Sequence, residues 1–255
     1  MLEKKILIGN FEKMPQSIKC PSCISGLLLI DASAHKEIRT AYSEKNYRKQ
    51  FIGFDEKYQS ICSECFHCNN SECNESSILT GTIEGDLVFI FSEIYGHDVP
   101  DHEVKISIKH IEPALDIIDI PNELPENLKN ELRKAFYIFW ADKDACANRL
   151  GIFIELLLNN LELYPGKKLH DRLELMQKSS EARYTNLASK LMAIKWIRND
   201  GSHIEKRLTH DVIDALEILE NALKALYDNS EDLINKKVKE INKIFEKKSN
   251  IGDSQ

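Results

Sequence analysis

The segment Arg198-Asn199-Asp200-Gly201-Ser202-His203 carries residue types that could perform acid–base chemistry on a phosphate. Histidine has an unperturbed pKa near neutrality, so His203 can accept and return a proton at physiological pH. The guanidinium of Arg198 is a planar, permanently charged fork that suits a phosphate accumulating negative charge. The two side chains together predict phosphate chemistry that needs no metal ion.

A helix end would position this pair. Gly201 and the polar residues before it are typical of a point where a helix stops and the chain turns. The reversal can bring Arg198 and His203 to one spot, whereas five residues along a continuous helix would set them about 140° apart. Apolar residues at helical spacing predict that this helix covers residues 183–199: Leu187, Leu191, Ile194 and Ile197.

Structural interpretations of the same residues compete with the catalytic one, because an Arg with a His five positions later also arises by chance. Arg198 could be a cation that complements the dipole at a helix end. Asn199-Asp200-Gly201 is an ordinary way to end a helix, and His203 could be a loop histidine.

The cysteines predict a structural zinc site. Cys20-Pro-Ser-Cys23 and Cys62-Ser-Glu-Cys65 are two C-x-x-C turns near short β-like runs, the arrangement of a zinc ribbon in which four thiolates close a tetrahedral site. The second pair is ambiguous, because Cys68 also follows Cys65 at C-x-x-C spacing and Cys73 comes soon after. A small β domain would draw much of its stability from such a metal.

Other interpretations of the cysteines compete with structural zinc. They are free thiols, a redox pair in one C-x-x-C turn, and a catalytic zinc that uses His67. Two such turns in one chain favour the structural metal over these alternatives. Cys146 lies in a helical apolar pattern and is expected to be a small buried hydrophobe.

Composition narrows the class of protein. With 42% apolar and 29% charged residues, the 255-residue chain has the composition of a soluble globular protein. It has no run of roughly 18 apolar residues and no signal-peptide pattern at its start, so we expect a cytoplasmic protein. The net charge of −7 argues against a constitutive coat on nucleic acid, which would need a basic surface.

The pattern changes near Pro121, which predicts an α+β chain with a small N-terminal β domain over residues 1–120 and a helical bundle over 121–230. Residues 231–255 are expected to form a Lys-rich helix and tail. Strands are predicted at 27–30, at 87–91 as a buried strand, and at 104–108 as a half-buried one. Before residue 183, helices are predicted over 124–140, 142–162 and 166–178, and a fifth helix is expected to begin with Thr209 as its N-cap.

The stretch from Lys195 to His203, with Leu208-Thr209 and a helix ending at Tyr227, resembles a bacterial family known as domain of unknown function 4145. That family is grouped with the HEPN superfamily of helical ribonuclease-like domains, and paired C-x-x-C turns often precede it. The resemblance covers residues of about 15–228. It implies a helical HEPN-like bundle that dimerises, so that two R-x4-H motifs form one composite site.

The resemblance also implies an activity, metal-independent cleavage of single-stranded RNA that leaves 2′,3′-cyclic phosphate ends. His203 would move the proton, Arg198 would bind the phosphate, and Asn199 would orient the backbone or the histidine. Asp142 or Asp144 could add a polar group, although both suit a helix N-terminus. Arg149 and Glu155 could instead form a salt bridge inside the bundle.

Two classes of function follow. One is an enzyme, a homodimeric endoribonuclease with structural zinc and no catalytic metal, acting as a toxin or anti-phage effector whose partner is an antitoxin or defence subunit. The other is a non-catalytic zinc-ribbon and HEPN-like module that binds nucleic acid or serves as a scaffold subunit in a defence or restriction system. The acidic charge favours the second, and the intact R-N-x-x-x-H pattern favours the first. No phosphate-binding glycine loop indicates a nucleotide-dependent activity.

Overall fold

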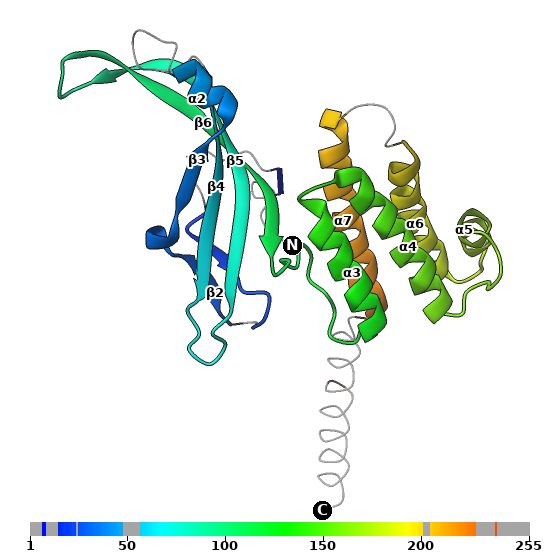
Figure 1. Cartoon of the computed structure of the whole chain (residues 1–255). Coiled ribbons are helices and arrows are strands. Elements are labelled where there is room, and N and C mark those ends of the chain that lie inside the picture. Colours follow the sequence, from blue (N-terminus) through cyan, green and yellow to red (C-terminus); the bar gives the residue numbers. More distant parts are fainter. Residues whose placement is uncertain are drawn as a thin grey trace, which may run out of the picture.

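The computed structural model describes residues 7–8, 15–23, 25–47, 57–200, 205–227 and 238. Within these ranges, nothing is described of the side chains of residues 46–47, 198–200 and 205–208. Strands come first along the chain and helices second, and the two parts lie side by side (Figure 1).

The N-terminal part is a six-stranded, fully antiparallel sheet. Its strand order is β1-β2-β4-β5-β6, and β3 pairs with β4 beside β2. The short helices η1 (Ala32–Ala34) and α2 (Ala41–Tyr47) flank β3. The strands are β1 (Ser17–Lys19), β2 (Leu27–Ile30), β3 (Lys36–Arg39), β4 (Lys57–Cys68), β5 (Ser76–Ser92) and β6 (His97–Glu112).

One side of the sheet is buried, and the burial alternates with the pleat. Along β5 the odd-numbered residues from Ser77 to Gly85 are buried, and along β4 the even-numbered ones from Ser60 to Phe66 are. Ile106 and Ile108 of β6 lie on the same buried side, which confirms the half-buried strand predicted there. The strand predicted at 87–91 exists as part of β5, but its predicted burial is wrong, since Phe89 and Phe91 are exposed.

The C-terminal part consists of helices, and the bounds of the first four lie within a few residues of those predicted. Asp142 caps α4 by accepting a hydrogen bond from the Ala145 N–H at 2.9 Å. The predicted Thr209 cap is wrong, because Thr209 lies inside a helix that the structure describes from Glu205 onward. The helices are α3 (Glu126–Phe139), α4 (Lys143–Asn160), α5 (Leu169–Gln177), α6 (Ala182–Asp200) and α7 (Glu205–Tyr227). Within the described ranges, none of them is long and apolar enough to cross a membrane.

The sheet and the helices share one hydrophobic core. Leu28 and Phe66 of the sheet belong to the same buried cluster as Phe136 and Leu157 of the helices. The link between β6 and α3 is itself buried at Leu115, Ile117 and Ile118. These contacts join the two parts by burial of apolar surface, the main favourable term in folding.

Polar and aromatic contacts reinforce this junction. The N–H of Asp119 donates a hydrogen bond to Glu220 of α7 at 3.0 Å. The ring of His110 on β6 meets Tyr137 of α3 edge-on, with centroids 5.2 Å apart. The helices α3 and α7 therefore contact β6 and the segment that follows it.

The predicted fold class needs correction. The chain is α+β, but the N-terminal part is a curved antiparallel sheet with strands of up to 17 residues, not a small zinc ribbon. An all-helical HEPN-like bundle is not shown either, because the helices complete their core with residues of the sheet and of the connecting segment. Strand length escaped prediction because polar and glycine residues interrupt the apolar runs of β5 and β6 without ending them.

Candidate functional site

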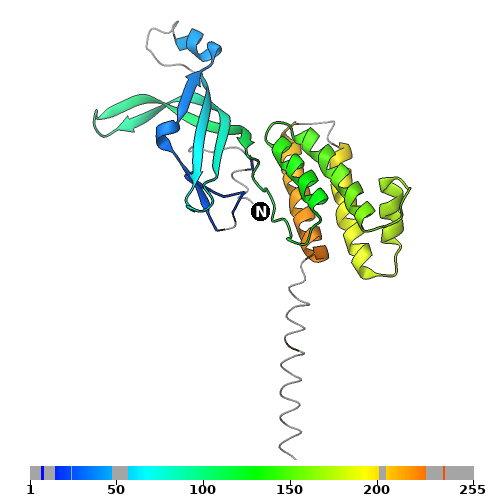
Figure 2. The ribbon, with the colours of Figure 1, turned by 60° about the horizontal axis from the view of Figure 1, so that its bottom comes forward.

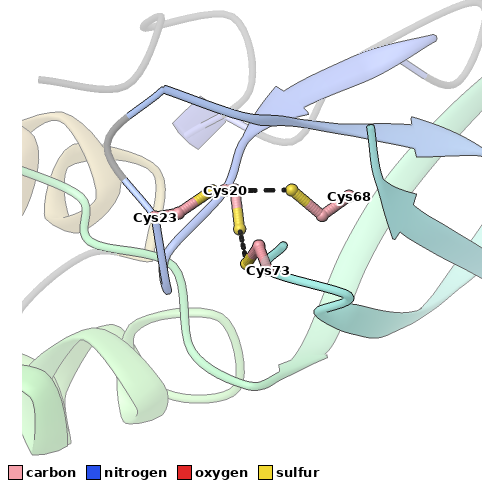
Figure 3. Close-up of side chains that lie close together, drawn as sticks. All are labelled: Cys20, Cys23, Cys68 and Cys73. Carbon is pink, nitrogen blue, oxygen red and sulfur yellow. Dashed lines mark hydrogen bonds between the residues drawn. The ribbon is translucent and has the colours of Figure 1, made fainter. Parts of the chain in front are cut away.

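Four cysteines from two loops meet beside the sheet (Figure 3). Cys20 and Cys23 lie in the loop between β1 and β2, whereas Cys68 ends β4 and Cys73 lies in the turn before β5. Because β2 pairs with β4, with Leu28 opposite Cys68, the two loops emerge next to each other. The sheet register therefore brings the four thiols together.

The sulfur positions suit a tetrahedral metal ion. The Sγ atoms of Cys20 and Cys73 are 3.7 Å apart, and those of Cys23 and Cys68 are 3.6 Å apart. All four sulfurs lie within 4.8 Å of one another. A tetrahedron with zinc–sulfur bonds of about 2.3 Å has edges of roughly 3.8 Å, close to these separations.

Backbone hydrogen bonds close both cysteine loops in the same way. The Cys20 N–H donates to the carbonyl of Gly26 at 3.0 Å, and the Cys68 N–H donates to that of Glu75 at 2.8 Å. Asn70 adds donors to sulfur, with its N–H 3.5 Å from Cys68 Sγ and its side-chain amide 3.7 Å from Cys23 Sγ. Such donors stabilise thiolate charge and orient the ligands.

Gly26 lies against the thiol cluster. A Cβ at this position would stand 2.4 Å from Cys68 Sγ and 2.7 Å from Cys23 Sγ. Both distances are far below van der Waals contact. The close approach of the two loops thus requires glycine here.

Cys62 and Cys65, predicted as the second pair of ligands, do not join this cluster. The two cysteines are three residues apart within β4, so their side chains point to opposite faces of the sheet and cannot form a metal-binding turn. Burial, together with the carboxylates of Glu64 and Glu37, raises the pKa of Cys62 to about 11, so it stays a neutral thiol. Cys68 and Cys73, the alternative that the spacing left open, complete the site with Cys20 and Cys23.

The donor set fits a structural metal. Four thiolates are the ligands that zinc takes in closed sites, with no open position for a substrate. Cys20 is buried and the other three cysteines are partly buried, as expected of a site that ties loops together. In these loops a bound zinc ion would supply folding stability, and the reactive chemistry would have to come from elsewhere in the chain.

The Arg198 segment falls at the end of α6. The backbone of Arg198 and Asn199 is helical and belongs to the last turn of α6, as the apolar spacing predicts. Their side chains, and all of His203, lie outside the described residues. Trp196, two positions before Arg198, is 54% exposed, with the Lys195 ammonium 4.1 Å from its ring centroid.

The other predicted polar residues have structural roles. Asp142 is the cap of α4, and Asp144 lies in the first turn of that helix, where a carboxylate complements the dipole. Arg149 pairs with Glu131 of α3 at 2.8 Å. The sequence analysis did not identify Glu131, which is 7% exposed. The one hint in the sequence is that this acidic residue lies among the apolar positions on the buried face of α3.

The chain is an α+β protein in which a curved sheet shares its core with helices. Two loops of the sheet carry a cluster of four thiols. Residues 133–247 match the model of a family described as a domain of unknown function (DUF4145). The resemblance of the helical part to that family is therefore confirmed, although the match begins after the sheet and names neither HEPN proteins nor a zinc ribbon. No curated protein and no solved structure matches the chain.

Proposed function

We propose that this protein is a metal-independent endoribonuclease of the HEPN type that cleaves single-stranded RNA. The 2′-hydroxyl would attack the adjacent phosphorus while His203 accepts its proton. His203 would return this proton to the 5′-oxygen as its bond to phosphorus breaks, so that a 2′,3′-cyclic phosphate and a 5′-hydroxyl remain. Arg198 would neutralise the charge that develops on the phosphate, and Asn199 would orient the histidine or the backbone.

The observation that carries this proposal is the R-N-x-x-x-H pattern at the end of α6, inside the segment that matches the family model. The backbone of Arg198 lies in the last turn of that helix. A single chain has one such motif. We therefore propose that two chains associate and that each supplies half of the site.

The role of the metal in this proposal is structural. A zinc ion held by Cys20, Cys23, Cys68 and Cys73 would tie the β1–β2 and β4–β5 loops together. All four positions would be filled by protein sulfur, so the metal would not activate the RNA or a water molecule. RNA cleavage should therefore continue in EDTA for as long as the protein stays folded.

Purified protein incubated with single-stranded RNA in EDTA tests the proposal. Wild-type protein should yield 2′,3′-cyclic phosphate ends, and His203→Ala should lower the rate at least about a hundredfold, the usual contribution of a general base. His210→Ala, at an exposed position on α7, is the matched control and should cleave normally. Equal cleavage by wild type and His203→Ala would show that the activity is a contaminant and would refute the assignment.

The acidic composition favours a second candidate, a non-catalytic binding module in a defence or restriction system. A net charge of −7 weakens association with RNA and suits contact with another protein. In that case Arg198 and His203 would be structural. Substituting either would then lower the melting temperature, and no RNA cleavage would be seen with the wild type.

A further inference from the structure

The hairpin of β5 and β6 extends beyond the other described strands of the sheet. Lys57, the first described residue of β4, lies opposite Asp86, so among the described residues the stretch from Leu87 to His102 contains pairing of β5 with β6 alone. We call residues 87–102 the arm. Both views show it pointing away from the helices (Figures 1 and 2).

The arm exposes apolar side chains that continue the buried side of the sheet. In β5 the odd-numbered residues face the core as far as Gly85. The next odd-numbered residues, Leu87, Phe89 and Phe91, lie on the same side of the strand but in the arm. Phe89 is 66% exposed and Phe91 is 65% exposed. At the tip, Ile94 is 90% exposed and Tyr95 is 68% exposed.

This exposure is unusual on energetic grounds. A two-stranded hairpin is marginally stable by itself in water, and its aromatic residues normally gain stability by packing against a third element. Contiguous apolar surface of this kind marks an interaction site in soluble proteins. The arm therefore has the properties of a surface that a partner covers.

The charge around the arm selects the kind of partner. Within the arm the chain has three carboxylates, Glu93, Asp98 and Asp101, and neither Lys nor Arg. Glu93 and Asp98 flank the tip, and Asp98 lies directly opposite Phe91 in the hairpin. Such a surface repels RNA, anionic lipid and another copy of the arm, and it attracts a basic surface.

We propose that the arm docks into another protein that presents an apolar groove rimmed by Lys and Arg side chains. Phe89, Phe91 and Tyr95 would enter the groove, because buried aromatic residues dominate interface energies. The carboxylates would pair with the basic rim and fix the orientation. The proposal goes beyond RNA cleavage and does not depend on it.

Photocrosslinking in cells that express the full chain tests this inference. A photoreactive p-benzoylphenylalanine replaces Phe91, and the crosslinked protein is identified and then purified for binding measurements. Its affinity for the wild-type chain should fall at least about tenfold in the Phe89→Ser/Phe91→Ser variant. It should also fall as salt is raised from about 0.05 to 0.5 M, since screening weakens the charged rim.

Ile61→Ser is the matched control, because Ile61 is 55% exposed on β4 of the same sheet, outside the arm. This variant should bind the partner like wild type, and circular dichroism should show that both variants fold. Polyuridylate RNA, phosphatidylglycerol vesicles and self-association in the ultracentrifuge are the competing probes. The proposal is overturned if no crosslinked protein forms, if the arm variant binds like wild type, or if only a competing probe depends on Phe89 and Phe91.

Discussion

The sulfur atoms of Cys23 and Cys68 lie 3.6 Å apart, although 45 residues separate them in the sequence. The pairing of β2 with β4 causes this approach, because it sets the β1–β2 loop beside the end of β4. A metal held by these thiols would link two strand connections that are distant along the chain. Loss of the metal should therefore loosen the sheet locally before it affects the helices.

Zinc content should distinguish the two sets of cysteines. Wild-type protein should hold about one zinc ion per chain, and Cys68→Ser or Cys73→Ser should lose it, since three thiolates leave the tetrahedral site incomplete. Cys62→Ser and Cys65→Ser should retain it. Metal analysis by mass spectrometry after gel filtration measures this, and equal zinc in all four variants would contradict the assigned ligands.

Gly26→Ala should weaken metal binding without removing a ligand. The new methyl group would collide with Cys23 Sγ and Cys68 Sγ, so the loops must move apart. We expect zinc affinity to fall about 10- to 100-fold, the usual effect of disturbing the surroundings of a metal ligand. Competition with a chromogenic chelator gives the affinity, and an affinity equal to that of the wild type would contradict the expected collision.

Arg198→Lys tests the phosphate-binding role within the proposed nuclease. Lysine keeps the positive charge but loses the planar fork, so RNA cleavage should fall about 10- to 100-fold in rate while RNA binding changes little. Arg183→Lys, an exposed residue near the start of α6, serves as the control. If Arg198→Lys cleaves at the wild-type rate, the fork geometry has no part in catalysis.

Stability should depend on pH through Lys143. Burial lowers the pKa of this ammonium from 10.5 to about 8, where it lies 3.7 Å from the centroid of the Phe139 ring. Between these pH values the unfolded chain binds more protons at this site than the folded chain, so the free energy of unfolding rises with pH. The nearby Cys146 stays neutral in this window, because burial raises its pKa to about 12.

Lys143→Met isolates this effect. Urea unfolding at about pH 7.5 and pH 10 should show wild type gaining stability relative to Lys143→Met as pH rises, because only the wild type releases a proton here. Titration of other groups is common to both proteins and cancels in the difference. A difference that is constant or moves the other way would show that the ammonium is well solvated.

Arg172 should be essential to the turn between α4 and α5. It is 4% exposed, its Nε donates to the Leu163 carbonyl at 2.8 Å, and its Nη1 donates to Asn159 Oδ1 at 2.6 Å. Arg172→Ala should lower the free energy of unfolding by about 3 kcal/mol, since the acceptors lose a charged donor and a cavity remains. Arg172→Lys should recover less than half of the loss, because an ammonium lacks the fork.

The helices were predictable because their signal is local. The apolar periods of α3, α4, α5 and α6 predict bounds within a few residues of those observed, and Asp142 at the start of α4 confirms a helix start readable from sequence. The long hairpin of β5 and β6 was less readable. Glycines and acids interrupt its alternation, and the exposure of Phe89 and Phe91 contradicts the rule that apolar strand residues are buried.

The metal ligands show the limit of spacing arguments. Cys20 and Cys23 were identified because their turn is local, whereas the second pair depended on where β4 ends. The two cysteines of a C-x-x-C sequence inside a strand point to opposite faces of the sheet. Because β4 continues to Cys68, Cys62 and Cys65 lie inside this strand and cannot both be ligands of one metal ion.

The sequence by itself determined that the chain is α+β, where its helices lie, that its thiols suit zinc and that an Arg–His motif stands at a helix end. Each of these features depends on residues that are close together in the chain. The tertiary structure alone decided the curved sheet, the choice of Cys68 and Cys73, the core shared by sheet and helices, and the exposed arm. These depend on strand register and long-range burial, which bring together residues that no local pattern connects.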